Sequence, residues 1–322
     1  MNKKYDVVSL GELLIDFTLN GKSEQGNNLF EANPGGAPCN VLSMLSKLGK
    51  KTAFIGKVGE DQFGILLKEA LDKIGISTEN LVMDKDFNTT LAFVHTAIDG
   101  ERNFSFYRKP GADMMLKAAE IKEELLTETK IFHFGTLSMT DDEVRKATKI
   151  AIKIAKKNGA IISFDPNLRP PLWDDLNFAK EQMIYGMKEC DILKISDDEL
   201  EFVTGCKDVD LGIAFVQQNY PIKLLFVTQG KDGSIACWDQ KKIRVAGFPQ
   251  ENTVDTTGAG DTFCGCILNY ILEHGLDNIT KKDLEDMLEF ANAAAALVTT
   301  RRGALFSMPE KEEVLNLIGL PN

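Results

Sequence analysis

Short apolar segments rich in β-branched residues alternate with amphipathic segments along most of this 322-residue chain. Several of the apolar segments contain almost no polar residue, which is typical of strands that helices cover on both faces. Such an alternation predicts βαβ units, in which successive strands run parallel. We therefore expect an α/β fold with a doubly wound, mostly parallel sheet, its strands formed by residues 5–17, 51–59, 130–137, 160–167, 191–196 and 223–230.

The segments between these strands carry apolar residues at the spacing of a helix. One series of apolar residues ends at Gly75 and a second ends at Asn158-Gly159. Glycine and asparagine are common residues at the ends of helices. The apolar positions of the two series are Phe63, Leu66, Leu67, Ala70, Leu71 and Ile74, and then Val144, Ala147, Ile150, Ala151 and Ile154. Helices of this kind flank the sheet, and ligands of such folds bind beyond the carboxyl ends of the strands.

Two segments, residues 17–33 and 87–110, interrupt the alternation. Each has a polar turn, Asn20-Gly21 or Asp99-Gly100, between β-rich flanks, which favours a hairpin over a helix. Both segments lie near the first strands of the core. We expect one main domain over residues 1–322, with these two segments forming a small inserted β-sheet lid.

Charge and hydropathy exclude several classes of function. The chain has 37 Lys and Arg against 48 Asp and Glu, and its net charge of -11 argues against binding to nucleic acid or to an anionic membrane. No apolar run approaches the roughly 20 residues of a membrane-spanning helix, and the amino terminus lacks the pattern of a signal peptide. We expect a cytoplasmic protein that acts on small molecules.

The cysteines and histidines show no metal-binding pattern. The six cysteines are scattered and form no C-x-x-C pair, so we expect reduced and mostly buried thiols. The three histidines lie far apart in the sequence, and His133 falls in an apolar run, where a hydrogen-bonded core histidine is expected.

The segment DTTGAGDTF, residues 255–263, is the strongest chemical signal in the chain. The apolar residues that follow it have helical spacing up to Gly275, so Gly258-Ala259-Gly260 falls in a turn at a helix amino terminus. Such a turn offers unpaired N–H groups and the positive end of the helix dipole, and its small residues let a phosphate approach. The pattern predicts an anion hole.

Asp261 stands at the entrance of the same helix. A carboxylate there can accept the proton of a substrate hydroxyl that attacks a phosphoryl group held by the N–H groups. The alternative is that Asp261 is a helix cap and the glycines a tight turn. The pattern lacks the third glycine of a dinucleotide fingerprint, and it lacks the lysine of a Walker A loop.

A second glycine pair precedes another expected helix in PGGAPCN, residues 34–40. Gly36, Asn40 and Asp16, an acid in the first apolar run, could together bind adjacent hydroxyls of a polyol. A buried aspartate in such a run needs a partner or a ligand. A plain turn and helix cap is the competing interpretation of the glycine pair.

Nine segments carry a resemblance to a known family: GELLIDF, NPGGAPCNV, FIGKVGEDQFG, FSFYRKPGADMML, DPNLRPPLW, KISDDEL, VTQGKDGS, DTTGAGDTF and ANAAAALVTTRRGA. In this order they resemble the ribokinase-like carbohydrate kinases, also called the PfkB family, and within it the fructokinases. The resemblance covers nearly the whole chain. It implies the ribokinase-like fold, and it implies that the inserted lid often forms a dimer interface.

The resemblance also implies roles for individual residues. Asp261 corresponds to the catalytic base, and Gly258, Ala259 and Gly260 to the anion hole. The sugar hydroxyls would be bound by Asp16, Gly35, Gly36 and Asn40. The substrate or phosphate side of the cleft would be lined by Arg108, Asn167 and Arg169.

The nucleotide and ion sites follow from the same resemblance. ATP would be bound by Lys194, Ser196, Thr228, Gly230, Lys231, Gly233 and Asn292. A monovalent cation, K⁺, would lie among Asp255, Thr257, Val298, Arg301, Gly303 and Ser307. Mg²⁺ would be held mostly by phosphates and waters, with Glu199 acting on it through water.

The chain departs from many relatives at one of these positions. Those relatives carry N-x-x-E, whereas this chain has Ser196 before Glu199 in KISDDEL. A serine is a shorter partner for the hydrated metal than an asparagine. The residues 197–199 also have a simpler interpretation as an acidic first helical turn, and Arg301-Arg302 as a charged pair at a helix end.

We therefore expect an ATP-dependent carbohydrate kinase, most similar to fructokinase, that phosphorylates a primary hydroxyl. A 2-keto-3-deoxygluconate kinase is a rival, and its acidic substrate would need Arg108 or Arg169 as a partner. A nucleoside kinase fits less well, since no aromatic cage is evident. A non-catalytic sugar sensor is the alternative from another class, and a nicotinamide dehydrogenase is disfavoured because the dinucleotide fingerprint is absent.

Overall fold

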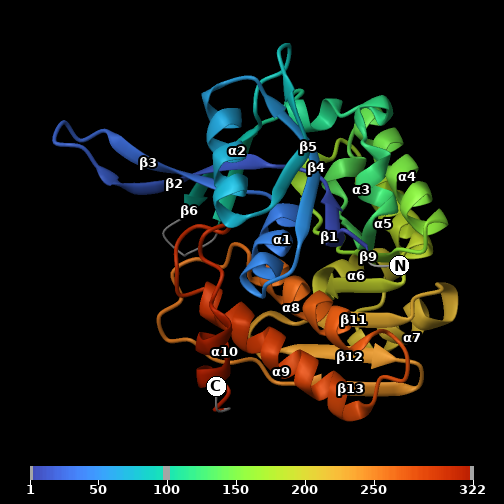
Figure 1. Cartoon of the computed structure of the whole chain (residues 1–322). Helices are drawn as coiled ribbons and strands as arrows, with labels where there is room; N and C mark the ends of the chain where they lie inside the picture. Colours follow the sequence, from blue (N-terminus) through green and yellow to red (C-terminus); the bar gives the residue numbers. More distant parts are fainter. Residues whose placement is uncertain (1–2, 97–101, 320–322) are drawn as a thin grey trace.

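The computed structural model describes residues 3–96 and 102–319. In this part of the chain, nine strands form a central sheet, and four strands form a small sheet beside it (Figure 1). The order of the central sheet is β13-β12-β11-β10-β9-β8-β1-β4-β5. Its strands are β1 (Tyr5–Leu10), β4 (Thr52–Gly59), β5 (Ser77–Asp84), β8 (Thr129–Phe134), β9 (Ile161–Phe164), β10 (Ile192–Ser196), β11 (Leu224–Thr228), β12 (Ser234–Trp238) and β13 (Lys241–Val245).

All neighbouring strands from β5 to β11 pair in parallel, and only the pairs β11-β12 and β12-β13 at one edge are antiparallel. The predicted mostly parallel α/β fold is thus confirmed. Because the strands are parallel, their carboxyl ends meet at one edge of the sheet, where ligands of such folds bind.

Helices cover both faces of the central sheet and enclose two hydrophobic cores. Val7 belongs to one core and its neighbour Val8 to the other, because successive side chains of a strand point to opposite faces. The first core includes α1 (Ala37–Lys47), α2 (Gln62–Ile74), α8 (Ala259–His274), α9 (Lys281–Val298) and α10 (Lys311–Leu317). The second includes α3 (Glu123–Thr127), α4 (Asp142–Lys157), α5 (Leu176–Glu189), α6 (Asp197–Thr204) and α7 (Val209–Asn219).

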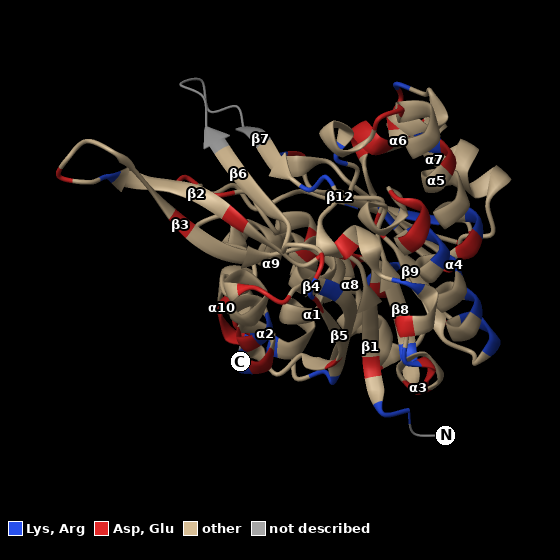
Figure 2. Ribbon diagram, turned by 90° about the horizontal axis from the view of Figure 1, so that it is seen from above, with Lys and Arg blue, Asp and Glu red and all other residues tan. Residues whose placement is uncertain are grey.

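The small sheet has the order β3-β2-β6-β7 and stands out from the body of the molecule (Figure 2). Its strands are β2 (Leu14–Lys22), β3 (Asn28–Gly35), β6 (Leu91–Thr96) and β7 (Arg102–Tyr107). They lie on the two segments expected to form the lid, of which residues 97–101 fall outside the described part. In the sheet, the Phe17 and Phe93 rings stack at 4.8 Å, and Phe17 meets Phe63 of α2 edge-on at 5.6 Å.

The apolar run of residues 5–17 is two strands, not the single strand expected from the sequence. β1 pairs with β4 and β8 in the central sheet, whereas β2 pairs with β3 and β6 in the small sheet. The chain passes between the sheets at Gly11, where a Cβ would lie only 2.5 Å from the Pro38 side chain. Asp16 therefore belongs to the small sheet.

Membrane-crossing helices were sought in the same described residues, and none is both long enough and apolar enough.

Candidate active site

The amino end of α8 lies at the carboxyl edge of the central sheet. Gly258 is the N-cap residue of this helix, with φ of 82°, a left-handed conformation that favours glycine. It provides no side-chain cap, and the Ala259 N–H donates to the Thr256 carbonyl oxygen at 3.3 Å. The positive end of the dipole and the next N–H groups of the first turn, those of Gly260 and Asp261, are what this end of the helix can offer a ligand. A Cβ on Gly260 would lie 3.0 Å from Lys194 Nζ, which places a buried ammonium group beside this turn.

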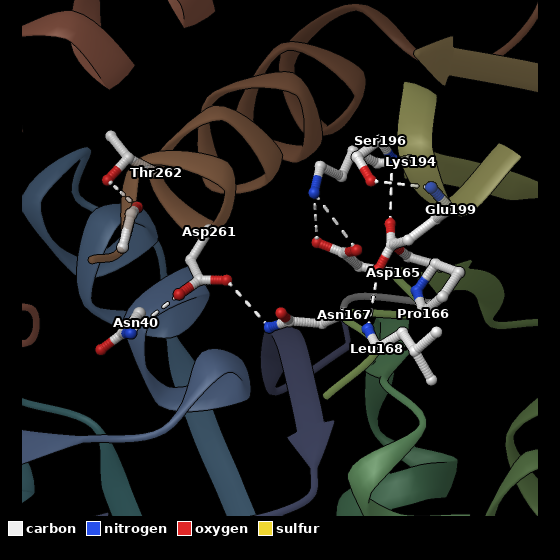
Figure 3. Close-up of polar contacts among 12 residues, drawn as sticks. Asn40, Asp165, Pro166, Asn167, Leu168, Lys194, Ser196, Glu199, Asp261 and Thr262 are labelled. Atoms are coloured by element: carbon white, nitrogen blue, oxygen red, sulfur yellow. Dashed lines mark hydrogen bonds and ion pairs between the residues drawn. The ribbon is translucent and has the colours of Figure 1, made fainter. Parts of the chain in front are cut away.

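Asp261 follows this turn and is held by two amides from distant parts of the chain (Figure 3). Asn40 Nδ2 donates to Oδ2 at 2.8 Å, and Asn167 Nδ2 donates to Oδ1 at 3.5 Å. Burial raises the pKa of Asp261 to about 6, although the hydrogen bond from Asn40 acts in the opposite direction. The carboxyl group is therefore able to exchange a proton near neutral pH.

The glycine pair before α1 brings the backbone close to two acids. A Cβ on Gly36 would meet the Glu12 carbonyl oxygen at 2.4 Å, and φ of 132° also disfavours any other residue there. A Cβ on Gly35 would lie 2.7 Å from Asp16 Oδ2. Burial raises the pKa of Asp16 to about 7, and the nearby Arg169 acts to lower it.

The turn after β9 is fixed by an ion pair at its start. Asp165 pairs with Lys194 of β10 at 3.0 Å, and both side chains are buried. Burial alone would lower the pKa of Lys194, but the carboxylates of Asp165, Glu199 and Asp261 together raise it. Asn167 in this turn has a left-handed backbone with φ of 44°, and its amide points toward Asp261.

Glu199 uses both of its oxygens on backbone groups. Oε1 accepts from Leu168 N–H at 2.7 Å and Oε2 from Ser196 N–H at 2.9 Å, while Ser196 Oγ accepts from Glu199 N–H at 3.2 Å. These contacts form a capping box at the start of α6, and they tie this helix to the turn after β9. The acidic helical turn considered in the sequence analysis is therefore present, and the predicted role of Glu199 toward magnesium stays a prediction.

A cavity of about 480 Å³ brings together five of the seven predicted nucleotide residues, and Lys194 and Ser196 do not line it. Thr228, Gly230, Lys231, Gly233 and Asn292 all line it, and it reaches Ala259 and Gly260 of the anion-hole turn. Its volume suits a small-molecule ligand or cofactor. Other lining residues were not selected from the sequence, among them Gly247, Phe248, Pro249, Gln250, Phe263 and Thr299.

Asn292 supports the wall of this cavity. Its Oδ1 accepts from Ser234 Oγ at 2.8 Å, and its Nδ2 donates to the Val245 and Ala246 carbonyl oxygens at 3.2 and 3.3 Å. Since both ends of the amide are engaged, Asn292 connects α9 to β12 and to the segment after β13. This is a structural contribution to the predicted nucleotide site.

The predicted cation residues lie on two segments that contact each other. The Val254 and Asp255 N–H groups donate to the Thr299 carbonyl oxygen at 2.8 and 3.1 Å, and Thr257 N–H donates to Asp255 Oδ1 at 2.8 Å. Arg301 directs its side chain to Glu313, as expected of a charged residue at a helix end. Val298, Gly303 and Ser307 are the remaining members of the set, and the buried Ser307 Oγ donates to the Ala304 carbonyl oxygen.

Arg108 is buried in a network of its own. It forms an ion pair with Asp113 at 2.7 Å, and it donates to Thr140 Oγ1 at 3.1 Å and to the Leu137 carbonyl oxygen at 3.0 Å. Leu137 and Asp261 both line a small cavity of about 10 Å³. Arg108 contacts Leu137 but does not line this cavity itself. These contacts engage the guanidinium without any substrate.

Two acids at the site were not singled out from the sequence. Glu12 Oε1 accepts from Ala37 N–H at 2.9 Å, and burial raises the pKa of Glu12 to about 7. Asp165 begins the DPNLR segment, from which only Asn167 and Arg169 were selected. Both acids line the small cavity beside Asp261. Glu12 could have been found by the argument used for Asp16, because it too is an acid in an apolar run.

His133 is a core residue, as predicted. It is buried, its Nδ1 lies 3.0 Å from Ser163 Oγ, and burial lowers its pKa to about 3. Among the residues that the structure describes, no group of three or more His, Cys, Asp or Glu could hold a metal ion.

Comparisons with known proteins found similarity along almost the whole chain. The model of the pfkB family carbohydrate kinases matches residues 4–311. "Probable fructokinase-2" of Arabidopsis thaliana and "Fructokinase-2" of Solanum lycopersicum are both 41% identical to this chain over 314 residues, which is 97% of this chain and 95% of each relative.

Solved structures with the same fold cover almost the whole chain. Fructokinase from Xylella fastidiosa with bound ATP has a TM-score of 0.88 and 32% identity, and 98% of each chain is covered. A double-mutant fructokinase from Vibrio cholerae O395, with bound fructose, ADP and potassium ion, has a TM-score of 0.87 and 28% identity. The match covers 99% of this chain and 100% of that chain. A putative ribokinase II from E. coli with ATP and Mg²⁺ has a TM-score of 0.86 and 28% identity, with 98% and 99% covered.

We predict that Arg108→Ala lowers the free energy of unfolding by about 3–5 kcal/mol, because Asp113 is left as a buried charge without its partner. Arg302→Ala is the control, since this exposed arginine has a hydrogen bond to Asn20 Oδ1 and no other among the described residues, and its loss should cost less than about 0.5 kcal/mol. Chemical denaturation of the three proteins measures both values. Unchanged stability of the Arg108 variant, with a raised KM for sugar, would show that Arg108 acts on substrate instead.

Proposed function

Because this chain belongs to the pfkB family of carbohydrate kinases, we propose that it is a fructokinase, which converts D-fructose and ATP to fructose 6-phosphate and ADP. One observation carries the proposal. Ala259 and Gly260 line the nucleotide-sized cavity, and Asp261, the next residue, accepts a hydrogen bond from Asn40 and lies within electrostatic range of Asp16 in the small sheet. A hydroxyl and a phosphate bound on these two sides would meet at Asp261.

The proposed reaction is a direct transfer. Asp261 takes the proton of the primary hydroxyl of the sugar, and the hydroxyl oxygen forms a bond to the γ-phosphorus. The bond from the γ-phosphorus to the bridging oxygen breaks, and its electron pair leaves with ADP. The N–H groups of the α8 turn and the ammonium group of Lys194 stabilise the charge on the transferring group. Asp261 then releases the proton to solvent.

The sugar side of the site suits a neutral polyol. Asp16, Asn40 and the backbone at Gly35 and Gly36 offer mostly acceptors and amide groups, which match hydroxyls. An acidic sugar would need a positive partner. Arg108 is engaged by Asp113, which leaves Arg169 as the remaining predicted arginine on this side. The engagement of Arg108, together with the fructokinase names of the relatives, favours fructose over 2-keto-3-deoxygluconate.

The cofactors are ATP and a divalent metal, as in structural neighbours solved with ATP and Mg²⁺ or with ADP and an ion. We propose Mg²⁺ as the metal, carried mainly by the phosphates, because the described residues offer no three-ligand cluster. When bound, Mg²⁺ neutralises phosphate charge. We propose K⁺ at the contact of the segments 255–257 and 298–307, where backbone carbonyl oxygens and Ser307 supply oxygen donors.

We propose that the small sheet is a lid and that two copies of the chain pair through it. Leu19 and Phe30 lie opposite each other on β2 and β3, and both are exposed. Tyr107 of β7 is 66% exposed, and its ring meets the Phe93 ring edge-on at 5.5 Å. A second copy would cover this apolar face. The cytoplasmic location and the absence of nucleic-acid and membrane partners stay predictions.

The substrate is tested by measuring ADP release from ATP with fructose, other hexoses, pentoses, 2-keto-3-deoxygluconate and nucleosides. We expect fructose to give the highest kcat/KM in the panel. A higher kcat/KM for the keto acid would contradict the fructokinase assignment. Failure of every acceptor to stimulate ADP release would favour a non-catalytic sugar sensor.

Asp261→Asn tests the general base. The amide keeps the size of the side chain and an oxygen that can accept from Asn40, but it cannot take a proton. We expect kcat with fructose to fall at least about 10²-fold, while the unfolding temperature and the Kd for ATP change little. Steady-state kinetics, thermal unfolding and calorimetric titration provide the three readouts. A kcat close to that of the unmodified enzyme would exclude Asp261 as the base.

Pairing through the lid is tested by the double variant Leu19→Glu, Phe30→Glu. Sedimentation velocity should show a dimer for the unmodified protein and a monomer for the variant, because opposed carboxylates cannot be buried unpaired. Leu211→Glu is the matched control, since Leu211 of α7 is 65% exposed and lies outside the small sheet. A dimer that survives the double substitution would place the interface elsewhere.

A further inference from the structure

The two oxygens of Asp261 have different environments. Oδ2 accepts a hydrogen bond of 2.8 Å from Asn40, which lies in the first turn of α1, and both residues are buried. Oδ1 has only the long contact of 3.5 Å from Asn167. In Figure 3 the carboxylate lies between the two amides, with the shorter bond on the side of Asn40. One oxygen is thus fixed, and the other is less constrained.

The chemistry of the pair determines how the Asn40 amide is oriented. Its nitrogen must face Asp261, because its oxygen there would meet a second acceptor. The Asn40 Oδ1 atom is buried and finds no donor among the described residues. Leaving an acceptor unpaired costs about 1–3 kcal/mol, so an asparagine is not the most stabilising residue at this position. Its value therefore lies in what the Nδ2 donor does for Asp261.

We propose that Asn40 is the positioning residue of the general base, and that it holds Oδ2 so that Oδ1 is the oxygen that takes the proton of the sugar hydroxyl. This inference rests on the proposed kinase function and adds to the predicted contact of Asn40 with sugar. A carboxylate with one oxygen fixed has a defined plane, which is what transfer of a proton over hydrogen-bond distance requires.

Besides the Asn40 amide, several charged groups act on the pKa of Asp261. Asp165 of the turn after β9 acts to raise the pKa of Asp261, while Lys194 of β10 and Arg169 act to lower it. Asp16 of β2 is also within electrostatic range, and Glu12 and His133 line the same small cavity. Burial outweighs the favourable charges. Among these influences the Asn40 amide makes the shorter direct contact with the carboxylate, and it stabilises the ionised form.

The sign of the pH effect follows directly. Asp261 acts as a base only when it is ionised, so activity should be lost as pH falls through its pKa. Removal of a donor that stabilises the ionised form raises that pKa. The acidic limb of the pH profile should therefore move to higher pH in Asn40 variants. A contact of Asn40 with sugar alone would raise KM and leave the limb in place.

The test compares Asn40→Ala and Asn40→Asp with Ser46→Ala, a control in the same helix. Ser46 Oγ lies 2.8 Å from Thr52 Oγ1, away from the site, so its loss should leave the pH profile unchanged. We expect Asn40→Ala to lower kcat at least about 10-fold and to raise the limb by about one pH unit. Asn40→Asp should raise it further, because two carboxylates in contact share a proton.

A second measurement needs no substrate. Carboxyl ¹³C NMR titration of the free protein gives the pKa of Asp261 directly, with its signal assigned by loss in Asp261→Asn. A higher pKa in Asn40→Ala than in the unmodified protein supports the proposal, even if fructose proves not to be the substrate. Equal pKa values in folded proteins would overturn it. If Asn40→Ala does not fold, Asn40→Ser provides the same comparison with a smaller cavity.

Discussion

The proposed active site depends on keeping a buried carboxylate ionised next to the place where we propose that the phosphate binds. Burial disfavours the charge on Asp261, and a phosphate nearby would disfavour it further. The structure opposes this with the Asn40 amide, the buried ammonium of Lys194 and the positive end of α8. These groups come from three separate segments of the chain, so the fold as a whole sets the protonation of one residue.

Close approach of the backbone is the second constraint. Gly36 has no room for a side chain against the Glu12 carbonyl oxygen, and Gly258 has a left-handed backbone at the start of α8. Both glycines lie where we propose that a substrate group comes near main-chain atoms. The small sheet begins at the same place, because β2 carries Asp16 and β3 ends at Gly35. The proposed lid and the proposed sugar site are therefore parts of one local structure.

Patterns within short segments were sufficient to predict much of this. The parallel sheet follows from the alternation of apolar runs, and the nucleotide residues from Thr228 to Gly233 line one cavity as a set. Contacts between distant segments could not be predicted in the same way. The ion pair of Asp165 with Lys194 joins the turn after β9 to β10, and only the register of these two strands brings the residues together.

Side chains that form hydrogen bonds with backbone groups could not be recognised from the sequence either. Arg108 was selected because it is an arginine in a motif of the family. The sequence alone does not distinguish an arginine that binds substrate from a buried arginine that pairs with an aspartate, as Arg108 does with Asp113. Glu199 likewise combines a capping box with a bond to Leu168, and both roles need only an acid at that position. Burial and partner geometry distinguish these cases, and neither is visible before the chain is folded.

The most direct test is a crystal structure with fructose and a non-hydrolysable ATP analogue bound. The account predicts that the primary hydroxyl oxygen lies within hydrogen-bond distance of Asp261 Oδ1, with the γ-phosphorus on its far side and the N–H groups of the α8 turn facing the phosphate. A structure with the sugar hydroxyl turned away from Asp261, with no water between them, would contradict it.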